Sequence, residues 1–296
     1  MGVPWSDCVE AHAAYDGPVA FIEEPYGVLV GTTMRVMTWN VWGRFGPWEN
    51  RHRAIVSTIR SVDPDVVLLQ ESWSAADGSS QAARLGAELG LHSSPVAADL
   101  LFESWGPCNA LLSRWPIEDV RRHDLPQLSA AGWGGIALRC LVEGPRRPVL
   151  IYNVALDWPP HASAAREHAL RHLVEIIADD VAVTRAPLVV GGDLNAGPDS
   201  DEIRMLTGQR SPSREGFVLF DAWDHADGRT PAETWSRANP WAAPSLLPNR
   251  RIDYLLTGWP RRGGVGSPIA AWTVGHGDDE DKPASDHYAV VADIRY

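Results

Sequence analysis

The chain has 296 residues, of which 45% are hydrophobic and 22% charged, so it can bury a large core as one big domain or two modest ones. Its formal net charge is −12, from 38 acidic and 26 basic residues. Proteins that grip long nucleic acid normally carry a basic stripe, so this balance argues against DNA or RNA as the main ligand. Every basic residue except Lys282 is arginine, and a local arginine cluster remains able to hold one or two phosphates.

No stretch approaches the roughly 20 apolar residues that a transmembrane helix needs, and the first thirty residues lack the basic start and apolar segment of a secretory signal. The three cysteines, Cys8, Cys108 and Cys140, are widely spaced and form no metal-ligand pattern. We therefore expect free thiols in a reducing compartment, and hence a cytoplasmic protein without a transmembrane segment.

Residues 1–33 show no clear hydrophobic period and are interpreted as an N-terminal extension of a single domain at 34–296. Two alternatives are open for this extension: it is disordered, or it packs on the domain through its aromatic side chains Trp5, Tyr15, Phe21 and Tyr26.

From Met34 onwards the hydrophobic pattern alternates between strands and helices. Strands are expected at 34–40, 65–70, 108–112, 135–142, 149–156, 187–191, 251–256 and 287–294, and helices at 51–62, 79–90 and 161–180. Many of these strands are apolar on both faces, which predicts two packed sheets with helices outside. The Trp- and Pro-rich stretch 221–248 is expected to be a long ordered loop that shapes a pocket.

Polar residues follow several of these hydrophobic runs, where a strand hands the chain to a loop and can present a side chain at the rim of a sheet. They are Asn40, Glu71, Asp193, Asn195, Asp253, Asp286 and His287. Carboxylate and amide oxygens suit a hard cation such as Mg²⁺ or Mn²⁺, and a single imidazole suits proton transfer. The pattern therefore predicts a site for metal-assisted cleavage of a phosphoester.

Six short motifs, five of which carry these residues, follow one another along the chain in the order TWNVWG, LLQES, SRWPI, GGDLN, RIDYLL and SDHYAV. Each is weak alone, but together they resemble the endonuclease/exonuclease/phosphatase superfamily over residues 34–296. The resemblance implies an α+β fold, a four-layer αββα sandwich of two packed mixed β-sheets flanked by helices, with a Mg²⁺-dependent site at one edge of the sheets.

The resemblance also implies roles for the acidic and amide residues. Glu71 matches the metal-binding glutamate and Asn40 the metal-proximal asparagine, while Asp286 contributes to the metal or holds the site together. Asp193 and Asn195 resemble the pair that orients the attacking water and touches the scissile phosphate. The alternative for this pair is an Asx turn after a strand, and the two interpretations are compatible.

His287 is expected to act as the general base or the phosphate-facing imidazole, oriented by Asp253, because a carboxylate partner fixes the imidazole tautomer. Arg114 in SRWPI either points at phosphate or braces a turn. Where the family commonly reads Thr-His-Leu, this chain has Ala155 in place of the histidine, so one donor to the phosphate is missing. His161, six residues downstream, is a weaker candidate to replace it.

Two classes of function remain open. The first is a metal-dependent hydrolase of a small or lipid-like phosphoester, with a nuclease as its runner-up; the second is a catalytically silent binding module, suggested by Ala155 alone. The acidic net charge favours a small-molecule substrate over long nucleic acid. Trp223, Trp235 and Trp241 are expected to line its pocket, unless they only stabilise their loop by burial.

Overall fold

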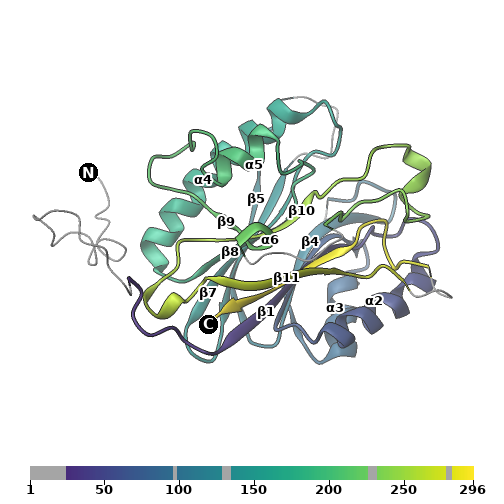
Figure 1. Cartoon of the computed structure of the whole chain (residues 1–296). Coiled ribbons are helices and arrows are strands. Elements are labelled where there is room, and N and C mark those ends of the chain that lie inside the picture. The colour runs from purple at the N-terminus through teal and green to yellow at the C-terminus, as the bar shows by residue number, and fades with distance from the viewer. Residues whose placement is uncertain (1–24, 96–98, 129–134, 226–231, 278–281) are drawn as a thin grey trace, which may run out of the picture.

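The computed structural model describes residues 25–95, 99–128, 135–225, 232–277 and 282–296. These residues form two six-stranded sheets that pack face to face, with helices on both outer sides (Figure 1). The first sheet has the order β11-β12-β1-β2-β4-β3. Its strands are β1 (Thr33–Asn40), β2 (Val66–Ala75), β3 (His92–Ser93), β4 (Trp105–Ser113), β11 (Pro268–Val274) and β12 (Ala289–Arg295).

The second sheet has the order β5-β6-β7-β8-β10-β9. Its strands are β5 (Ile117–Asp124), β6 (Ile136–Glu143), β7 (Pro148–Ala155), β8 (Leu188–Asp193), β9 (Phe220–Asp221) and β10 (Asp253–Thr257). The pairs β1–β2 and β7–β8 run parallel, and the other neighbouring strands run antiparallel, so both sheets are mixed as predicted.

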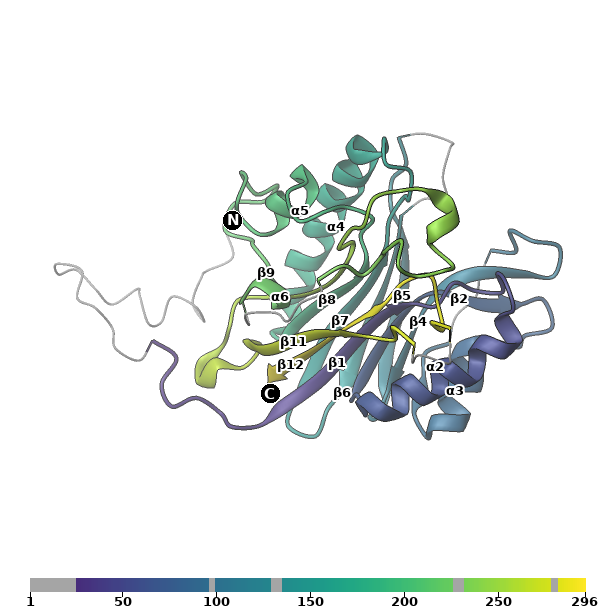
Figure 2. The same ribbon diagram turned by 45° about the vertical axis from the view of Figure 1, so that its right-hand side comes forward.

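The helices divide between the two outer faces, as Figure 2 shows. The first sheet is covered by α2 (Trp48–Val62) and α3 (Gln81–Leu89), and the second by α4 (Ser163–Thr184) and α5 (Asp201–Leu206). Three short elements, α6 (Ala222–His225), η1 (Ala243–Ser245) and η2 (Arg262–Gly264), lie in connections. The fold is therefore the four-layer αββα sandwich that the resemblance implied.

Alternation along the strands explains why the central runs are apolar throughout. On β7, Val149 and Ile151 face the other sheet, whereas Leu150 and Tyr152 face the helical layer. All four are fully buried. Each central strand thus contributes to two cores at once, one between the sheets and one under the helices.

Several predicted boundaries were wrong. Strands β5 and β11 and helix α5 were not predicted, and β2 continues past Gln70 to Ala75. Strands β5 and β11 are edge strands, and the exposed charges of β5 hide its period. The expected loop at 221–248 contains the end of β9, all of α6 and the 3₁₀ turn η1, with residues 226–231 outside the described part.

The described end of the predicted extension packs on the domain, because the Val30 amide donates to the Gly263 carbonyl and the Gly263 amide donates to the Tyr26 carbonyl. Trp5, Tyr15, Phe21 and Cys8 lie outside the described residues. The two cysteines within them, Cys108 and Cys140, are buried free thiols. Among the described helices, none has the length and apolar character required to cross a bilayer.

Candidate active site

Seven polar residues gather where the two sheets meet at one edge. Strands β1 and β8 end at this edge, and the antiparallel strands β10 and β12 begin there, so that Asp253 pairs in register with Asp193. The sequence predicted that each of these residues follows the end of a strand, and this prediction is wrong for three of them. Asp253 is the first residue of β10, and Asp286 and His287 precede β12.

Glu71 reaches the edge through a β-bulge rather than a strand end. Leu69 pairs with Ala110 and Ser72 with Cys108, so two residues of β2, Gln70 and Glu71, face one residue of β4. Glu71 has a φ of 50°, a left-handed conformation that is costly for a side chain of its type. A bulge bends its strand and re-aims a side chain, which here turns the Glu71 carboxylate toward the site.

Buried amides tie the two sheets together behind the bulge. Asn153 on β7 accepts a hydrogen bond of 2.7 Å from Gln70 Nε2. Its own amide donates to the carbonyl oxygens of Leu69 and Ala110, at 2.8 and 2.9 Å. Asn109 in turn donates to the Asn153 carbonyl at 2.9 Å. Sequence reasoning missed this network, although a lone amide inside an apolar strand was a usable signal.

Asn40 connects the carboxylates of the two sheets. Its Nδ2 donates to Glu71 Oε1 at 3.0 Å and to Asp193 Oδ2 at 3.1 Å. Its Oδ1 accepts from the Trp42 amide at 3.0 Å, and the hydroxyl of Ser285 donates to its carbonyl at 2.7 Å. In this arrangement Asn40 orients Glu71 and Asp193 through its nitrogen, and its oxygen faces away from them.

His287 and Asp253 form the hydrogen-bonded pair expected from the sequence. His287 Nδ1 lies 2.9 Å from Asp253 Oδ2, and its Nε2 lies 3.8 Å from Asp193 Oδ2. Asp253 is fully buried, and its backbone amide donates to the Thr234 hydroxyl at 3.1 Å. The second oxygen, Asp253 Oδ1, is buried and has no hydrogen-bond partner among the described residues.

Crowding of the acids shifts their protonation. Burial, reinforced by the charge of Asp286, raises the pKa of Glu71 to about 7. Burial and the charge of Asp253 likewise raise the pKa of Asp193 to about 7, and burial raises the pKa of Asp286. Burial opposes the charge on His287, but Asp253, Asp193 and Asp286 outweigh it and raise its pKa well above the ordinary value. The site holds more negative charge than its own residues neutralise.

These donors fit a hard divalent cation. Two positions are available: one beside Glu71 and Asp286, whose charges act on each other, and one among Asp193, Asp253 and His287. The ligand atoms of the second group lie within 4.8 Å of one another. Because His287 Nδ1 is already bonded to Asp253, the first position better matches an all-oxygen shell.

Arg51 of α2 is a residue that sequence reasoning missed. Its guanidinium donates to five backbone carbonyls, those of Val41, Trp42, Gly43, Phe45 and Ala284. Burial lowers its pKa to about 10, and the charges of Asp286 and Glu71 oppose that shift. Arg51 thus fixes the loop after β1 against the segment before His287. Its position in a helix gave no sign of this role.

Asp193 and Asn195 form the Asx turn that was the alternative interpretation. The backbone N–H of Asn195 donates to Asp193 Oδ1 at 3.0 Å, and Asn195 has a φ of 51°. The side-chain Nδ2 of Asn195 donates to the Leu156 carbonyl at 3.0 Å. Asn195 is buried beside Asp193. It therefore holds the Asp193 carboxylate and the exit of β7 in place.

Two residues expected to touch substrate lie elsewhere. Arg114 pairs with Asp63 and Asp65 at 2.8 and 2.9 Å, where β2 begins rather than where it approaches the site. It braces the turn before β2, as its second interpretation held. Trp223 is buried in the core between the sheets, so its side chain stabilises the connection by burial.

The other two tryptophans lie closer to the site. Trp235 is buried and forms a β-bridge with His287. Trp241 is half-buried, donates from Nε1 to the Pro283 carbonyl at 2.7 Å and lies 5.7 Å from the ring of Trp42. At the exit of β7, Ala155 pairs in register with Asp193 and offers no side-chain donor, and His161 is exposed.

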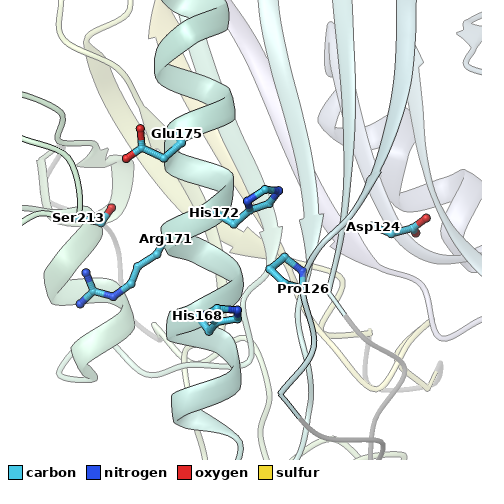
Figure 3. Close-up of a pocket in the computed structure, with 7 residues that line it drawn as sticks. All are labelled: Asp124, Pro126, His168, Arg171, His172, Glu175 and Ser213. Atoms are coloured by element: carbon cyan, nitrogen blue, oxygen red, sulfur yellow. The ribbon is translucent and has the colours of Figure 1, made fainter.

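A cavity of ≈ 580 Å³ opens on α4, away from the predicted site residues, none of which lines it. Figure 3 shows His168 and His172 on the side of α4 that faces Pro126, with Arg171 and Glu175 projecting from the other side. The cavity is an open surface hollow, whereas the seven polar residues of the candidate site lie at the edge of the sheets.

Solved structures with the same architecture cover most of the chain. A truncated TDP2 from Caenorhabditis elegans matches with a TM-score of 0.68 and 21% identity over 90% of this chain and 99% of that one. A functionally unknown conserved protein from Enterococcus faecalis V583 matches at 0.66 and 22%, over 88% and 98%. An endonuclease/exonuclease/phosphatase from Beutenbergia cavernae DSM 12333 matches at 0.64 and 25%, over 89% and 71%.

Comparison with curated proteins gave no match. The family model described as "Endonuclease/Exonuclease/phosphatase family" matches residues 37–287, an interval that runs from β1 to His287 and encloses all seven polar residues of the site. With both the fold and most of the sequence in agreement, the chain belongs to the endonuclease/exonuclease/phosphatase family.

Proposed function

We propose that the protein is a divalent-cation-dependent hydrolase that cleaves a small or lipid-like phosphoester, with Mg²⁺ or Mn²⁺ as its cofactor. The observation that carries this proposal is the hydrogen bond between His287 and Asp253, formed next to Asp193 and within the same acidic group as Glu71. The members that the family description names, endonucleases, exonucleases and phosphatases, all hydrolyse phosphoester bonds.

The carboxylates of Glu71 and Asp286 would hold the cation, with Asn40 fixing the orientation of Glu71. When bound, it supplies positive charge that polarises the phosphoryl oxygens and lowers the pKa of the groups around it. The orphaned Asp253 Oδ1 and the raised pKa of Glu71 and Asp193 are what an acidic site shows without its counter-charge.

His287 takes the proton from the attacking water. In the neutral imidazole, Nδ1–H donates a hydrogen bond to Asp253, which leaves the lone pair of Nε2 free, and the Asp253 carboxylate stabilises the imidazolium that forms. Asp193 Oδ2 lies 3.8 Å from Nε2, so a water between them can donate to both. Asn195 holds Asp193 from behind, and its contribution to the reaction is therefore to position that carboxylate.

An aromatic wall beside the metal position supports a small substrate with an apolar or ring-shaped body. Trp241 lies against Trp42, and the backbone amide of Trp42 is itself bonded to Asn40. A side chain at Gly43 would be crowded, because a Cβ there would lie 3.0 Å from the Trp105 ring and 3.2 Å from the Glu71 carbonyl. Aromatic rings therefore flank Glu71, and the net charge of −12 opposes a long polyanion.

A substrate panel tests the proposal. The purified protein is incubated with Mg²⁺ or Mn²⁺ and plasmid DNA, nucleotides, sphingomyelin-like lipids, sugar phosphates or nitrophenyl phosphodiesters, and Glu71→Gln serves as the matched control. We expect cation-dependent turnover of a small or lipid-like ester, lost in the control. Cleavage of plasmid alone at physiological salt would establish a nuclease instead, and cation binding without turnover of any substrate would indicate the silent binding module.

A further inference from the structure

Arg250, just before β10, is held next to the active site by its backbone. Its amide donates to the Trp235 carbonyl at 2.9 Å and its carbonyl accepts from the Trp235 amide at 3.0 Å. Trp235 also forms a β-bridge with His287. Trp235 therefore links Arg250 to His287, the proposed general base. Backbone pairing with Trp235 fixes the position of the Arg250 backbone relative to that of His287.

The guanidinium of Arg250 is the unusual feature. It is half-buried, its Cζ lies 5.4 Å from the centre of the Trp235 ring, and its Nε is buried without a hydrogen-bond partner among the described residues. The neighbouring Arg251, by contrast, is tied to Asp221 at 2.6 Å and Asp224 at 3.3 Å. A buried cation normally has its donors paired, so the Nε–H of Arg250 lacks the acceptor that such a group usually has.

Charges of the active site act on Arg250. Burial lowers the pKa of Arg250, and the carboxylates of Asp193 and Asp253 oppose the shift, so the guanidinium lies within electrostatic reach of both. Among the described residues no hydrogen bond joins the Arg250 guanidinium to either carboxylate. Asp253 Oδ2 is bonded to His287 and Asp253 Oδ1 has no partner, while Asp193 is bonded to Asn40 and Asn195. The carboxylates attract the arginine toward the site while leaving its donors available.

We propose that Arg250 binds a non-bridging oxygen of the substrate phosphoryl group and of the phosphate product, next to His287 and Asp193. This inference rests on the proposed function, because it assumes that the ligand is a phosphoester. Three acidic residues repel a phosphate on this side of the site, and Ala155, in register with Asp193, gives no donor to offset them. A guanidinium supplies both charge and paired donors, and stacking on Trp235 limits its freedom before the ligand arrives.

Binding of inorganic phosphate tests this role apart from turnover. Titration calorimetry in Mg²⁺ buffer compares the wild type with Arg250→Gln, Arg250→Lys and the exposed Arg237→Gln from the same loop. We expect Arg250→Gln to weaken phosphate binding at least tenfold, as expected when a charge-assisted hydrogen bond is lost. The lysine variant restores part of the affinity, and Arg237→Gln binds like the wild type.

The inference is overturned if the wild type does not bind phosphate, if Arg250→Gln binds it as tightly as the wild type, or if Arg237→Gln weakens it equally. Arg250→Lys separates ligand contact from structure, since it keeps the charge and a stem that covers Trp235; unchanged melting temperature with intermediate affinity supports contact. On the ester found by the panel, Arg250→Gln should lower kcat/KM by about 10²-fold. If phosphate binding depends on Arg250 but the protein hydrolyses no ester, the proposed function is wrong and the role of Arg250 in phosphate binding still holds.

Discussion

Replacing Asp253 by asparagine removes one charge from the site with almost no change of shape. In the wild type, Asp253 Oδ2 lies 2.9 Å from His287 Nδ1, and the carboxylate is fully buried. Asparagine keeps the size of the side chain but cannot stabilise an imidazolium by charge. Where its amide nitrogen faces the ring, His287 must also carry its proton on Nε2, next to Asp193, and can no longer accept one from water.

The expected loss follows from these two effects. A hydrogen bond to a charged group contributes about 1.5–3 kcal/mol, so losing the ion pair alone lowers kcat by roughly 10- to 150-fold. The wrong tautomer adds to this, and the same change in Ser-His-Asp triads reaches about 10⁴-fold. We therefore expect a fall in kcat of about 10²- to 10⁴-fold for Asp253→Asn, with a much smaller change in KM.

Asp253 is also the carboxylate that contributes most to the raised pKa of His287, so that pKa should fall toward its ordinary value in the variant. In the wild type the raised pKa of His287 adds to the free energy of unfolding of the metal-free protein. This added stability is fully present below about pH 6.5 and is lost as pH rises through the folded-state pKa of His287. Asp253→Asn should weaken this dependence of stability on pH. Kinetics against pH and NMR titration of the His287 ring are compared with the exposed Asp199→Asn. A kcat within tenfold of the wild type, or an unshifted ring titration, would refute the reasoning.

The free energy of unfolding of the metal-free protein should fall by about 3 kcal/mol as pH rises from about 4.5 to about 7. The reason is that burial raises the pKa of Glu71 to about 7, so the folded state keeps the Glu71 proton at pH values where the unfolded state has lost it. Glu71→Gln should remove this loss in urea titrations at pH 5 and pH 8, and a pH dependence equal to that of the wild type would contradict it. In the wild type, Mn²⁺ affinity should rise with pH up to about 7 and fall at least tenfold in Glu71→Gln, as calorimetry can measure; equal affinity in the variant would place the cation elsewhere. Asn153→Ala should cost about 3–5 kcal/mol, because it removes three buried hydrogen bonds, one from Gln70 Nε2 and two to the carbonyls of Leu69 and Ala110. Urea unfolding measures that cost against the exposed control Asn50→Ala, and a loss below 1 kcal/mol would show that water replaces the amide.

The parts of the fold and the site that the sequence predicted share one property: they are local. A buried strand such as β8 is a short apolar run with a polar exit, so both the strand and the polar end that carries Asp193 follow from a few neighbouring residues. The meeting of Asp193, Asp253 and His287 was predicted from their motifs, and the structure brings them together.

What the sequence did not predict depends on partners far along the chain. The bulge at Glu71 exists because β4 supplies one residue fewer than β2, which the run LLQES alone does not contain. Trp223 and Trp241 both lie in the Trp- and Pro-rich stretch 221–248, yet one is buried between the sheets and the other is half-buried beside Trp42. The unpartnered guanidinium of Arg250 likewise becomes visible only when all its neighbours are placed.

The site is divided between two sheets that must dock before it exists. Asn40, Glu71, Asp286 and His287 come with the first sheet, and Asp193, Asn195 and Asp253 with the second; the 3.1 Å bond from Asn40 to Asp193 crosses the seam. A folding intermediate with one sheet formed has only part of the site, since Glu71 and Asp286 come with the first sheet and Asp193 and Asp253 with the second, and it cannot cleave an ester before assembly is complete. A cation that binds the native protein and not the unfolded chain stabilises the native protein by about 2.7 kcal/mol at a hundred times its Kd. The free energy of unfolding of the sandwich therefore depends on the concentration of the cation.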